Sequence, residues 1–384
     1  TSVDAMANLI KKNLIDIIGA ARPSIADPFL PKKIQENRLE DIRECIGCNI
    51  CYAGDSLGVP IRCTQNPTMG EEWKRGWHPE VLPNKTSNDS ILIVGSGPSG
   101  LEAAHALGKR GYQVLVAEEK EMIGGRVVLE SKLPSLNEWI RVKDYRQQQF
   151  LKLPNVKIFL KSKLETKDIL DTDVNHVVIA TGANWRSDGF GRSNTLPIKK
   201  LSNYQNIYNP DDIMQGLIPF GKVVVFDDDY YYLAPIIAEM LQKNGCEVTY
   251  VTTSSIVCEF GNHTSEQFNT QKSLINSGVK LIFSKNILSY ENKELNLSCV
   301  YSNKTTNIEL DALVMITSRI PNDKLYYELK DKIKDSDRFS SVSKIGDCLA
   351  PATIASAVYD GRKYAMEFDD DSSENYLNKR DFNF

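Results

Sequence analysis

Apolar residues occur in short continuous runs along the chain, and helical segments separate these runs. The run at 91–94 leads into a glycine-rich turn, residues 99–111 have the pattern of a helix, and a second run covers 112–117. Continuous apolar runs are typical of parallel strands that are covered on both faces of a sheet. The pattern therefore predicts a βαβ unit.

The same order of elements occurs again in the second half of the chain. After Gly221 we expect a strand at 222–226, a helix over 232–243 and a strand at 246–252. Further strands are expected at 176–182 and 312–317, and a short strand with an antiparallel meander at 279–309. The predicted fold is α/β, with two Rossmann-like nucleotide-binding units in tandem and the second inserted into the first.

The first residues have a different pattern. Residues 4–13 are expected to form an amphipathic helix, and residues 14–18 a buried strand. Because a lone helix and a lone strand cannot enclose a core, we expect this segment to be the end of a larger upstream domain.

Composition and charge exclude some classes of protein. The chain has 384 residues, which is enough for two or three domains with their own cores. Its net charge of −4 argues against a general nucleic-acid binder. No apolar run approaches the ~18 residues that a membrane span needs, and the first residues show no secretory signal. We therefore expect a cytoplasmic protein.

Four of the eight cysteines lie in one short segment with the spacing C-x2-C-x2-C-x11-C, namely Cys45, Cys48, Cys51 and Cys63. Three thiolates on a tight loop can reach three corners of a [4Fe–4S] cubane, and a fourth closes the site from a distance. Gly47 permits the sharp turn that the loop needs. Zinc sites usually have two separated C-x2-C pairs, so zinc is the weaker alternative, and unligated thiols are a third.

A glycine-rich turn, GSGPSG at 95–100, follows the strand at 91–94 and opens the next helix. Glycines there let a pyrophosphate approach the helix N-terminus, where backbone N–H groups and the helix dipole favour anions. Glu118 ends the second strand, where an acid can accept the ribose hydroxyls. The residues expected to bind the ADP moiety are Gly95, Gly97, Ser99, Gly100, Glu118 and Gly125. The alternative is a glycine-rich turn that binds no ligand.

Two further motifs are weak on their own. Thr181 and Gly182 end a buried strand, and Asp347 follows Gly346 just before the last helix. Each alone is more often a strand exit or a helix cap. In register with the first βαβ unit, they fit the crossing loop and the ribityl-facing acid of flavoproteins with two dinucleotide-binding domains.

The second unit lacks the glycines that a nicotinamide nucleotide requires. After the strand at 222–226, three aspartates and three tyrosines occupy residues 227–232. Carboxylates repel a pyrophosphate, and side chains with a Cβ prevent its close approach. We therefore expect no NAD(P)H site here, and the tyrosines either pack inside the protein or form a surface for a partner.

Five segments of the sequence resemble the trimethylamine dehydrogenase family, which includes the dimethylamine and histamine dehydrogenases. They are ARPSIADPFLP (21–31), DIRECIGCNIC (41–51), CTQNPTMGEEWKRGWHPE (63–80), ILIVGSGPSG (91–100) and VVIATGANW (177–185). The resemblance covers essentially the whole chain. More widely, the segments resemble old-yellow-enzyme-type reductases that carry a C-terminal flavoprotein module. One departure is the x11 spacing before the fourth cysteine, where trimethylamine dehydrogenase has x12.

This resemblance implies an N-terminal (β/α)8 barrel with FMN, a cluster segment and two nucleotide-binding-type domains. On that basis residues 1–40 are the end of the barrel, 41–87 the cluster segment and connector, 88–200 with 337–384 the ADP/FAD-binding domain, and 201–336 a degenerate NAD(P)-type domain. The amine-binding and catalytic residues then lie upstream of this chain.

The resemblance also implies the chemistry, which is oxidation of a small amine at its C–N bond. The amine loses a hydride equivalent to FMN, and electrons pass singly through the [4Fe–4S] cluster to an electron-transferring flavoprotein. Arg22 matches the arginine that contacts the FMN phosphate. The amine dehydrogenases bind ADP in the first nucleotide domain, whereas the residues themselves leave ADP or FAD open. A homodimer is also implied.

The sequence leaves two other functions open. One is an NAD(P)H-dependent enoate or 2,4-dienoyl-CoA reductase, which the aspartates and tyrosines at 227–232 disfavour. The other is that the isolated chain is only an electron-relay or nucleotide-binding module, because one barrel strand cannot build a substrate pocket.

Overall fold

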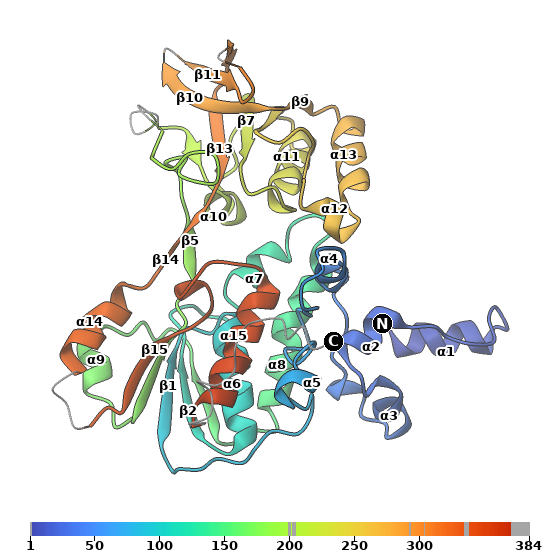
Figure 1. Cartoon of the computed structure of the whole chain (residues 1–384), viewed down its shortest axis with the longest axis vertical. Helices are drawn as coiled ribbons and strands as arrows, with labels where there is room; N and C mark the ends of the chain where they lie inside the picture. The colour runs from blue at the N-terminus through green and yellow to red at the C-terminus, as the bar shows by residue number, and fades with distance from the viewer. Residues whose placement is uncertain are drawn as a thin grey trace, which may run out of the picture.

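The computed structural model describes residues 2–198, 201, 205–291, 293–302, 304–333 and 338–369. Within this part of the chain, two five-stranded parallel sheets form the centres of two α/β units (Figure 1). The first sheet has the order β15-β4-β1-β2-β3, and the second has the order β6-β13-β7-β8-β9. The predicted α/β class with Rossmann-like parallel sheets is confirmed.

The first sheet contains the expected βαβ unit. Its strands are β1 (Ser90–Val94), β2 (Gln113–Ala117), β3 (Val156–Phe159), β4 (His176–Ile179) and β15 (Ser341–Lys344). Helices α6 (Pro98–Arg110) and α15 (Ile354–Glu367) pack together on one face, and α9 (Thr166–Leu170) and α14 (Lys324–Ile333) cover the other. Three further helical segments follow β2, namely α7 (Arg126–Glu130), η2 (Asn137–Ile140) and α8 (Arg141–Phe150). Burial on both faces explains the continuous apolar runs.

The second sheet is built in the same way. Its strands are β6 (Ile207–Tyr208), β7 (Lys222–Asp227), β8 (Glu247–Thr252), β9 (Lys280–Ile282) and β13 (Ala312–Ile316). Its helices are α10 (Pro210–Met214), α11 (Leu233–Lys243), α12 (Gly261–Thr264) and α13 (Gln267–Asn276), and α11 and α13 pack against one face. The predicted meander is present as β10 (Lys285–Glu291), β11 (Glu294–Cys299) and β12 (Thr305–Glu309). Its Leu295 and Leu297 pack with Val224 and Phe226 on the other face.

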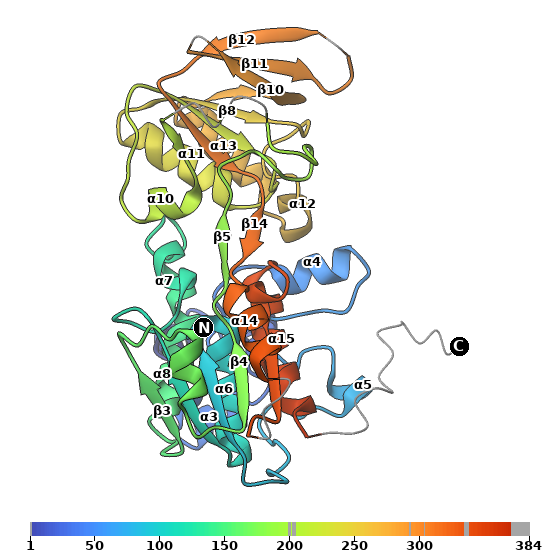
Figure 2. The same ribbon diagram turned by 90° about the vertical axis from the view of Figure 1, so that its left-hand side faces the viewer.

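Two short antiparallel strands connect the units, β5 (Ala183–Trp185) and β14 (Arg319–Pro321) (Figure 2). Arg319 and Trp185 are directly paired across them. In the sequence, the strands of the second sheet come between β4 and β15 of the first. Through β14, the chain that leaves the second sheet returns to the first unit.

The N-terminal part of the chain forms short helices. They are α1 (Val3–Lys11), α2 (Ala21–Ala26), α3 (Leu30–Gln35), η1 (Leu39–Asp41), α4 (Ile50–Ser56) and α5 (Glu72–Arg75). The helix expected at 4–13 is present, but the buried strand expected at 14–18 is wrong, because Leu14 is 65% exposed and Ile17 is 85% exposed. A strand needs a hydrogen-bonded neighbour, and no strand of the described residues pairs with this segment. Figure 1 shows α1 projecting from the body of the molecule.

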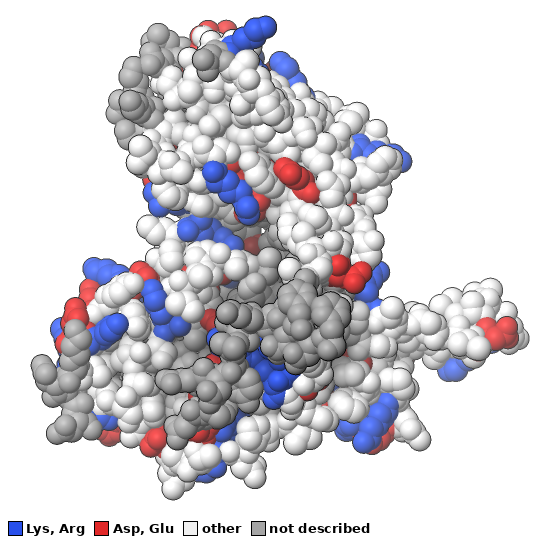
Figure 3. Space-filling model, in the orientation of Figure 1, with Lys and Arg blue, Asp and Glu red and all other residues white. Residues whose placement is uncertain are grey.

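The surface carries charges of both signs. On the face shown in Figure 3, Lys and Arg side chains lie interspersed with Asp and Glu. Among the residues that the structure describes, no helix is both long enough and apolar enough to cross a lipid bilayer.

Candidate functional site

The four cysteines of the 45–63 segment converge on one small pocket. The pocket is lined by Cys45, Cys48, Cys51 and Cys63, together with Arg22. Two residues in the left-handed conformation make the turn, Gly47 (φ 75°) and Asn49 (φ 53°), and α4 begins directly afterwards at Ile50. This conformation strains residues with a Cβ but not glycine. The four cysteines whose spacing predicted a cluster site thus line the same pocket.

Backbone donors point at the sulfur atoms at both ends of this segment. The N–H of Gly47 lies 3.4 Å from Cys45 Sγ, and the N–H of Gln65 lies 3.4 Å from Cys63 Sγ. Donors of this kind stabilise thiolates, and they are one of the factors that set the potential of an iron–sulfur cluster.

Burial raises the pKa of three cysteines of this set and so keeps them protonated unless a metal binds them. It raises the pKa of Cys63 to about 12, and it also raises the pKa of Cys48 and of Cys51. No disulfide joins the cysteines of the described residues. Because a coordinating metal deprotonates a thiol outright, these buried thiols form a chemically suitable ligand set.

The four cysteines line one pocket. In the described ranges, no three His, Cys, Asp or Glu side chains are placed to hold one ion together. In a cubane each thiolate binds a different iron, so the four ligands surround the cluster instead of one point. The residues fit a [4Fe–4S] cluster better than they fit zinc.

A larger cavity, of about 1270 Å³, lies at the carboxyl ends of the strands of the first sheet. It is lined by the predicted residues Gly95, Gly97, Ser99, Glu118, Gly125, Thr181, Gly182 and Asp347. Gly100 stands behind this lining, where a Cβ would lie 2.1 Å from the carbonyl oxygen of Gly95. Its role is the close helix–strand packing that the motif predicted, so we call the cavity the nucleotide cleft.

Gly97 leaves room for a ligand. It is the N-cap of α6, and no side chain caps this helix end. A Cβ on Gly97 would meet nothing within 4 Å, so the packing of the protein itself does not require glycine here. The free N–H groups of the helix end and the open space beside them together fit a phosphate.

Glu118 is fixed beside this loop. Its carboxylate accepts hydrogen bonds from the backbone N–H of Ser96 at 2.9 Å and from the Ser96 hydroxyl at 2.6 Å. It also accepts one from the N–H of Lys120 at 2.9 Å. The acid therefore sits at the end of β2 with a defined orientation, as ribose recognition requires.

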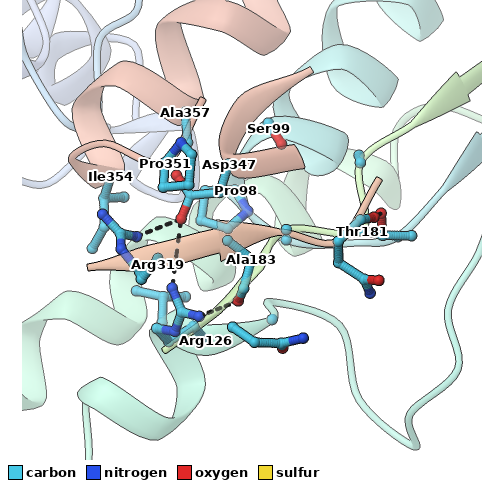
Figure 4. Close-up of a pocket in the computed structure, with 18 of the residues that line it drawn as sticks. Pro98, Ser99, Arg126, Thr181, Ala183, Arg319, Asp347, Pro351, Ile354 and Ala357 are labelled. Carbon is cyan, nitrogen blue, oxygen red and sulfur yellow. Dashed lines mark hydrogen bonds and ion pairs between the residues drawn. The ribbon is translucent and has the colours of Figure 1, made fainter. Parts of the chain in front are cut away.

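The α15 end of the nucleotide cleft is lined by an ion cluster in which Asp347 meets two arginines that the sequence did not predict (Figure 4). Asp347 accepts a hydrogen bond from Arg319 at 2.5 Å and pairs with Arg126 at 3.5 Å. Arg126 also donates to the carbonyl oxygen of Ala183 and pairs with Asp211 at 3.3 Å. Both arginines line the cleft. In the sequence, the glycine pair directly before Arg126 could have drawn attention to it, whereas no local pattern marks Arg319.

Two of the three aspartates of the 227–232 segment are folded inward, whereas Asp229 lines the nucleotide cleft. Asp227 is buried and accepts hydrogen bonds from the Tyr250 hydroxyl and from the N–H of Tyr230, the latter at 2.9 Å. Burial raises the pKa of Asp227 to about 7. Asp228 is also buried and accepts a hydrogen bond from the N–H of Ser193 at 2.9 Å.

Two tyrosines of the same segment pack against other aromatic rings. Tyr232 packs against Trp139 with ring centroids 4.7 Å apart, and its hydroxyl donates to Glu130 at 3.0 Å. Tyr231 packs against Phe260 at 4.8 Å. Both tyrosines are half-buried, and both also line the nucleotide cleft.

Arg22 lies beside the cysteines and not at the end of a strand. It is an exposed residue of α2, and its guanidinium donates to Asn49 Oδ1. Asn49 in turn donates to the carbonyl oxygen of Thr264, in α12 of the second unit, at 2.9 Å. Because the strand expected at 14–18 is absent, Arg22 does not follow a strand, although its side chain does border the cysteine pocket.

Known proteins match almost the whole chain. The family model of the pyridine nucleotide-disulphide oxidoreductases matches residues 89–225, and that of the OYE-like second alpha/beta domain matches 208–314. Dimethylamine dehydrogenase from Hyphomicrobium sp. (strain x) is 38% identical over 96% of this chain. The structure of histamine dehydrogenase from Rhizobium sp. 4-9 is 43% identical over 98% of this chain, with a TM-score of 0.94. The resemblance to the trimethylamine dehydrogenase family is confirmed.

A further solved structure is also similar to this chain. The structure of 6-hydroxypseudooxynicotine amine oxidase from Pseudomonas geniculata N1 is 44% identical over 96% of this chain, with a TM-score of 0.93. The chain spans little more than half the length of these relatives, namely 54% of the dimethylamine dehydrogenase, 58% of the histamine dehydrogenase and 55% of the amine oxidase.

Proposed function

We propose that this chain is the electron-handling half of a flavin-dependent amine dehydrogenase. On this proposal Cys45, Cys48, Cys51 and Cys63 hold a [4Fe–4S] cluster. Such a cluster supplies one-electron transfer, which lets the two electrons of an oxidised amine leave singly. The observation that carries the proposal is the convergence of the four cysteines on one pocket, in a chain that is 38% identical to a dimethylamine dehydrogenase.

The donor on this proposal is FMN in an upstream barrel, and the acceptor is an electron-transferring flavoprotein. We assign residues 1–40 to the end of that barrel, 41–87 to the cluster segment, 88–200 and 337–384 to the nucleotide-binding domain, and 201–336 to an inserted domain. Arg22 borders the cysteine pocket, which is a suitable place for an arginine that meets the FMN phosphate. The small amine binds upstream of this chain, and the enzyme is a homodimer.

We propose ADP, and not FAD, as the nucleotide in the cleft. The glycine loop and Glu118 suit the ADP moiety, which both nucleotides share. FAD also needs the acid before the last helix to be free for its ribityl chain. Here Asp347 is engaged by Arg319 and Arg126, and both arginines line the cleft.

An NAD(P)H-dependent reductase is the second candidate. The structure of a 2-naphthoyl-CoA reductase is 28% identical over 94% of this chain, with a TM-score of 0.79. Against this candidate stand the inward-folded aspartates Asp227 and Asp228, which leave no glycine loop for a second pyrophosphate. We therefore favour the amine dehydrogenase.

Anaerobic reduction of the full-length gene product distinguishes the two candidates. Dimethylamine and histamine are added separately as candidate amines, and NADH and NADPH are added to matched samples. We expect an amine, but neither nicotinamide nucleotide, to produce the electron paramagnetic resonance signal of a reduced cluster. A signal produced by NADPH and by neither amine would favour the reductase.

A further inference from the structure

Glu102 is the centre of a buried ion network between three helices. It lies in the second turn of α6, the helix that faces the nucleotide cleft. Its carboxylate accepts hydrogen bonds from Arg146 Nε in α8 at 2.8 Å and from Arg362 Nε in α15 at 3.0 Å. All three side chains are buried, with exposures of 1%, 0% and 1% in the order Glu102, Arg146 and Arg362.

This network contains more positive than negative charge. Burial opposes ionisation of Glu102, but the charges of Arg146 and Arg362 outweigh it and lower the pKa of Glu102. The neighbouring His105 adds no charge at neutral pH, because burial lowers its pKa to about 4. Two guanidinium groups therefore share one carboxylate. Within the described residues, Nη2 of Arg146 and both Nη atoms of Arg362 have no hydrogen-bond partner.

A neighbouring ion network has, in contrast, equal numbers of positive and negative groups. Lys33 pairs with Asp27 at 2.6 Å and Arg43 pairs with Glu80 at 2.9 Å, so that two cations meet two carboxylates. An unbalanced buried charge is costly unless another group compensates it. The network around Glu102 has one more positive charge than negative charge. We therefore expect a further negative group to compensate it.

Gln65 connects the network to the cysteine segment. Nη1 of Arg146 donates to Gln65 Oε1 at 3.3 Å, which determines how the amide is oriented. The amide Nε2 then donates to the carbonyl oxygens of Glu44 and Arg141, at 3.1 Å each. Gln65 is 1% exposed, so water does not replace these contacts.

Gln65 thereby spans both ends of the cysteine set. Its side chain holds the carbonyl of Glu44, the residue directly before Cys45. Its backbone N–H points at Cys63 Sγ from 3.4 Å. One buried residue therefore contacts both ends of the cysteine segment, and Arg146 holds its side-chain amide.

We propose that Gln65 and Arg146 are positioning residues that raise the reduction potential of the cluster assigned to the four cysteines. The proposal rests on the proposed function. A cluster with four thiolate ligands is an anion and gains a further negative charge when it accepts an electron. Donors at its sulfur atoms and nearby positive charge therefore favour the reduced state. The surplus charge around Glu102 then has the negative group that it lacks among the described residues.

The test is a redox titration of the chain after anaerobic reconstitution with iron and sulfide. Arg146→Gln removes the buried cation, and Gln65→Glu places a carboxylate where the amide donates. Gln242→Glu is the matched control, since Gln242 lies in α11 of the second unit and uses only its Oε1, which accepts from the N–H of Val248 at 3.0 Å. The cluster potential is followed by electron paramagnetic resonance, and iron is counted in each sample.

We expect Arg146→Gln and Gln65→Glu each to lower the equilibrium constant for cluster reduction about tenfold, which is about 59 mV for one electron. Gln242→Glu should leave the potential unchanged. Variants that hold full iron and titrate at the wild-type potential would overturn the inference while the cluster itself stands. A wild-type chain that binds no iron would instead overturn the proposed function. If Arg146→Gln does not fold, the potential of Gln65→Glu decides the question alone.

Discussion

Arg319 forms an ion pair with Asp347 at the end of the nucleotide cleft. Arg319 belongs to β14 and Asp347 stands just before α15, so the pairing of β14 with β5 is what brings them together. With Arg126, this pair lines the end of the cleft where, on the proposed function, the ribityl chain of FAD would lie. The connection between the two α/β units thus determines the shape of the cleft in the first.

Removing Arg319 should therefore change which nucleotide binds. We expect the wild-type chain to bind ADP and to bind FAD weakly, if at all. Arg319→Ala should keep ADP and bind FAD at least about tenfold more tightly than wild type, a change of about 1.4 kcal/mol, because the ribityl end of the cleft opens. Isothermal titration calorimetry measures both ligands.

A matched control for this experiment is Arg186→Ala. Arg186 pairs with Asp188 at 2.5 Å and does not line the cleft. Its removal should leave both affinities unchanged. Tight FAD binding by the wild-type chain would contradict the assignment of ADP.

A methyl group on Gly97 should affect the ligand and not the fold. A Cβ there meets nothing within 4 Å, and Gly97 has φ −68°, which alanine adopts without strain. We expect Gly97→Ala to weaken ADP binding about tenfold or more, or about 1.4 kcal/mol. Its melting temperature without ligand should change little, since an N-cap alanine costs only about 1 kcal/mol relative to better caps.

A methyl group on Gly100 should affect the fold itself. A Cβ there would stand 2.1 Å from the Gly95 carbonyl oxygen, so Gly100→Ala should lose stability whether or not ADP is present. Thermal unfolding with and without ADP separates the two effects. Equal ADP affinity in Gly97→Ala and wild type would show that no phosphate approaches this loop.

Glu130 should make the stability of the chain depend on pH. Burial raises its pKa from 4.5 to about 7. The folded state therefore holds this proton more tightly than the unfolded state, and the free energy of unfolding falls as the pH rises from about 4.5 to about 7. The full effect of one such group is about 3 kcal/mol.

Glu130→Gln should remove this dependence, because an amide does not ionise. Urea unfolding at pH 5 and pH 8 measures it, followed by the fluorescence of Trp139, which packs against the Tyr232 that bonds Glu130. Glu239→Gln is the control, as Glu239 forms a surface pair with Lys243. A pH slope that is the same in wild type and Glu130→Gln would refute the assignment.

Features that depend on neighbours in the sequence could be predicted, and features that depend on distant contacts could not. The cysteine set and the glycine loop each need only a local turn before a helix, and both are found where their spacing placed them. Arg319 and the Gln65–Arg146 contact join residues that only tertiary packing brings together. No local pattern marks such residues.

The segment at 14–18 is a case in which a local pattern led to a wrong prediction. Its apolar residues have the composition of a buried strand, but burial depends on a partner that the segment itself does not specify. In the described structure Ile17 is 85% exposed. Composition therefore indicates a tendency to be buried, and the neighbouring elements decide whether this happens.

The central claim is that the four cysteines hold a [4Fe–4S] cluster, and metal analysis tests it most directly. The chain is reconstituted anaerobically with iron and sulfide, desalted, and assayed for iron, sulfide and zinc. We expect four iron and four sulfide per chain in the wild type and a clear loss of both in Cys48→Ala. Cys299→Ser, which changes a cysteine of β11 outside the pocket, should keep both. One zinc per chain without sulfide, or an iron content that Cys48→Ala leaves unchanged, would contradict the claim.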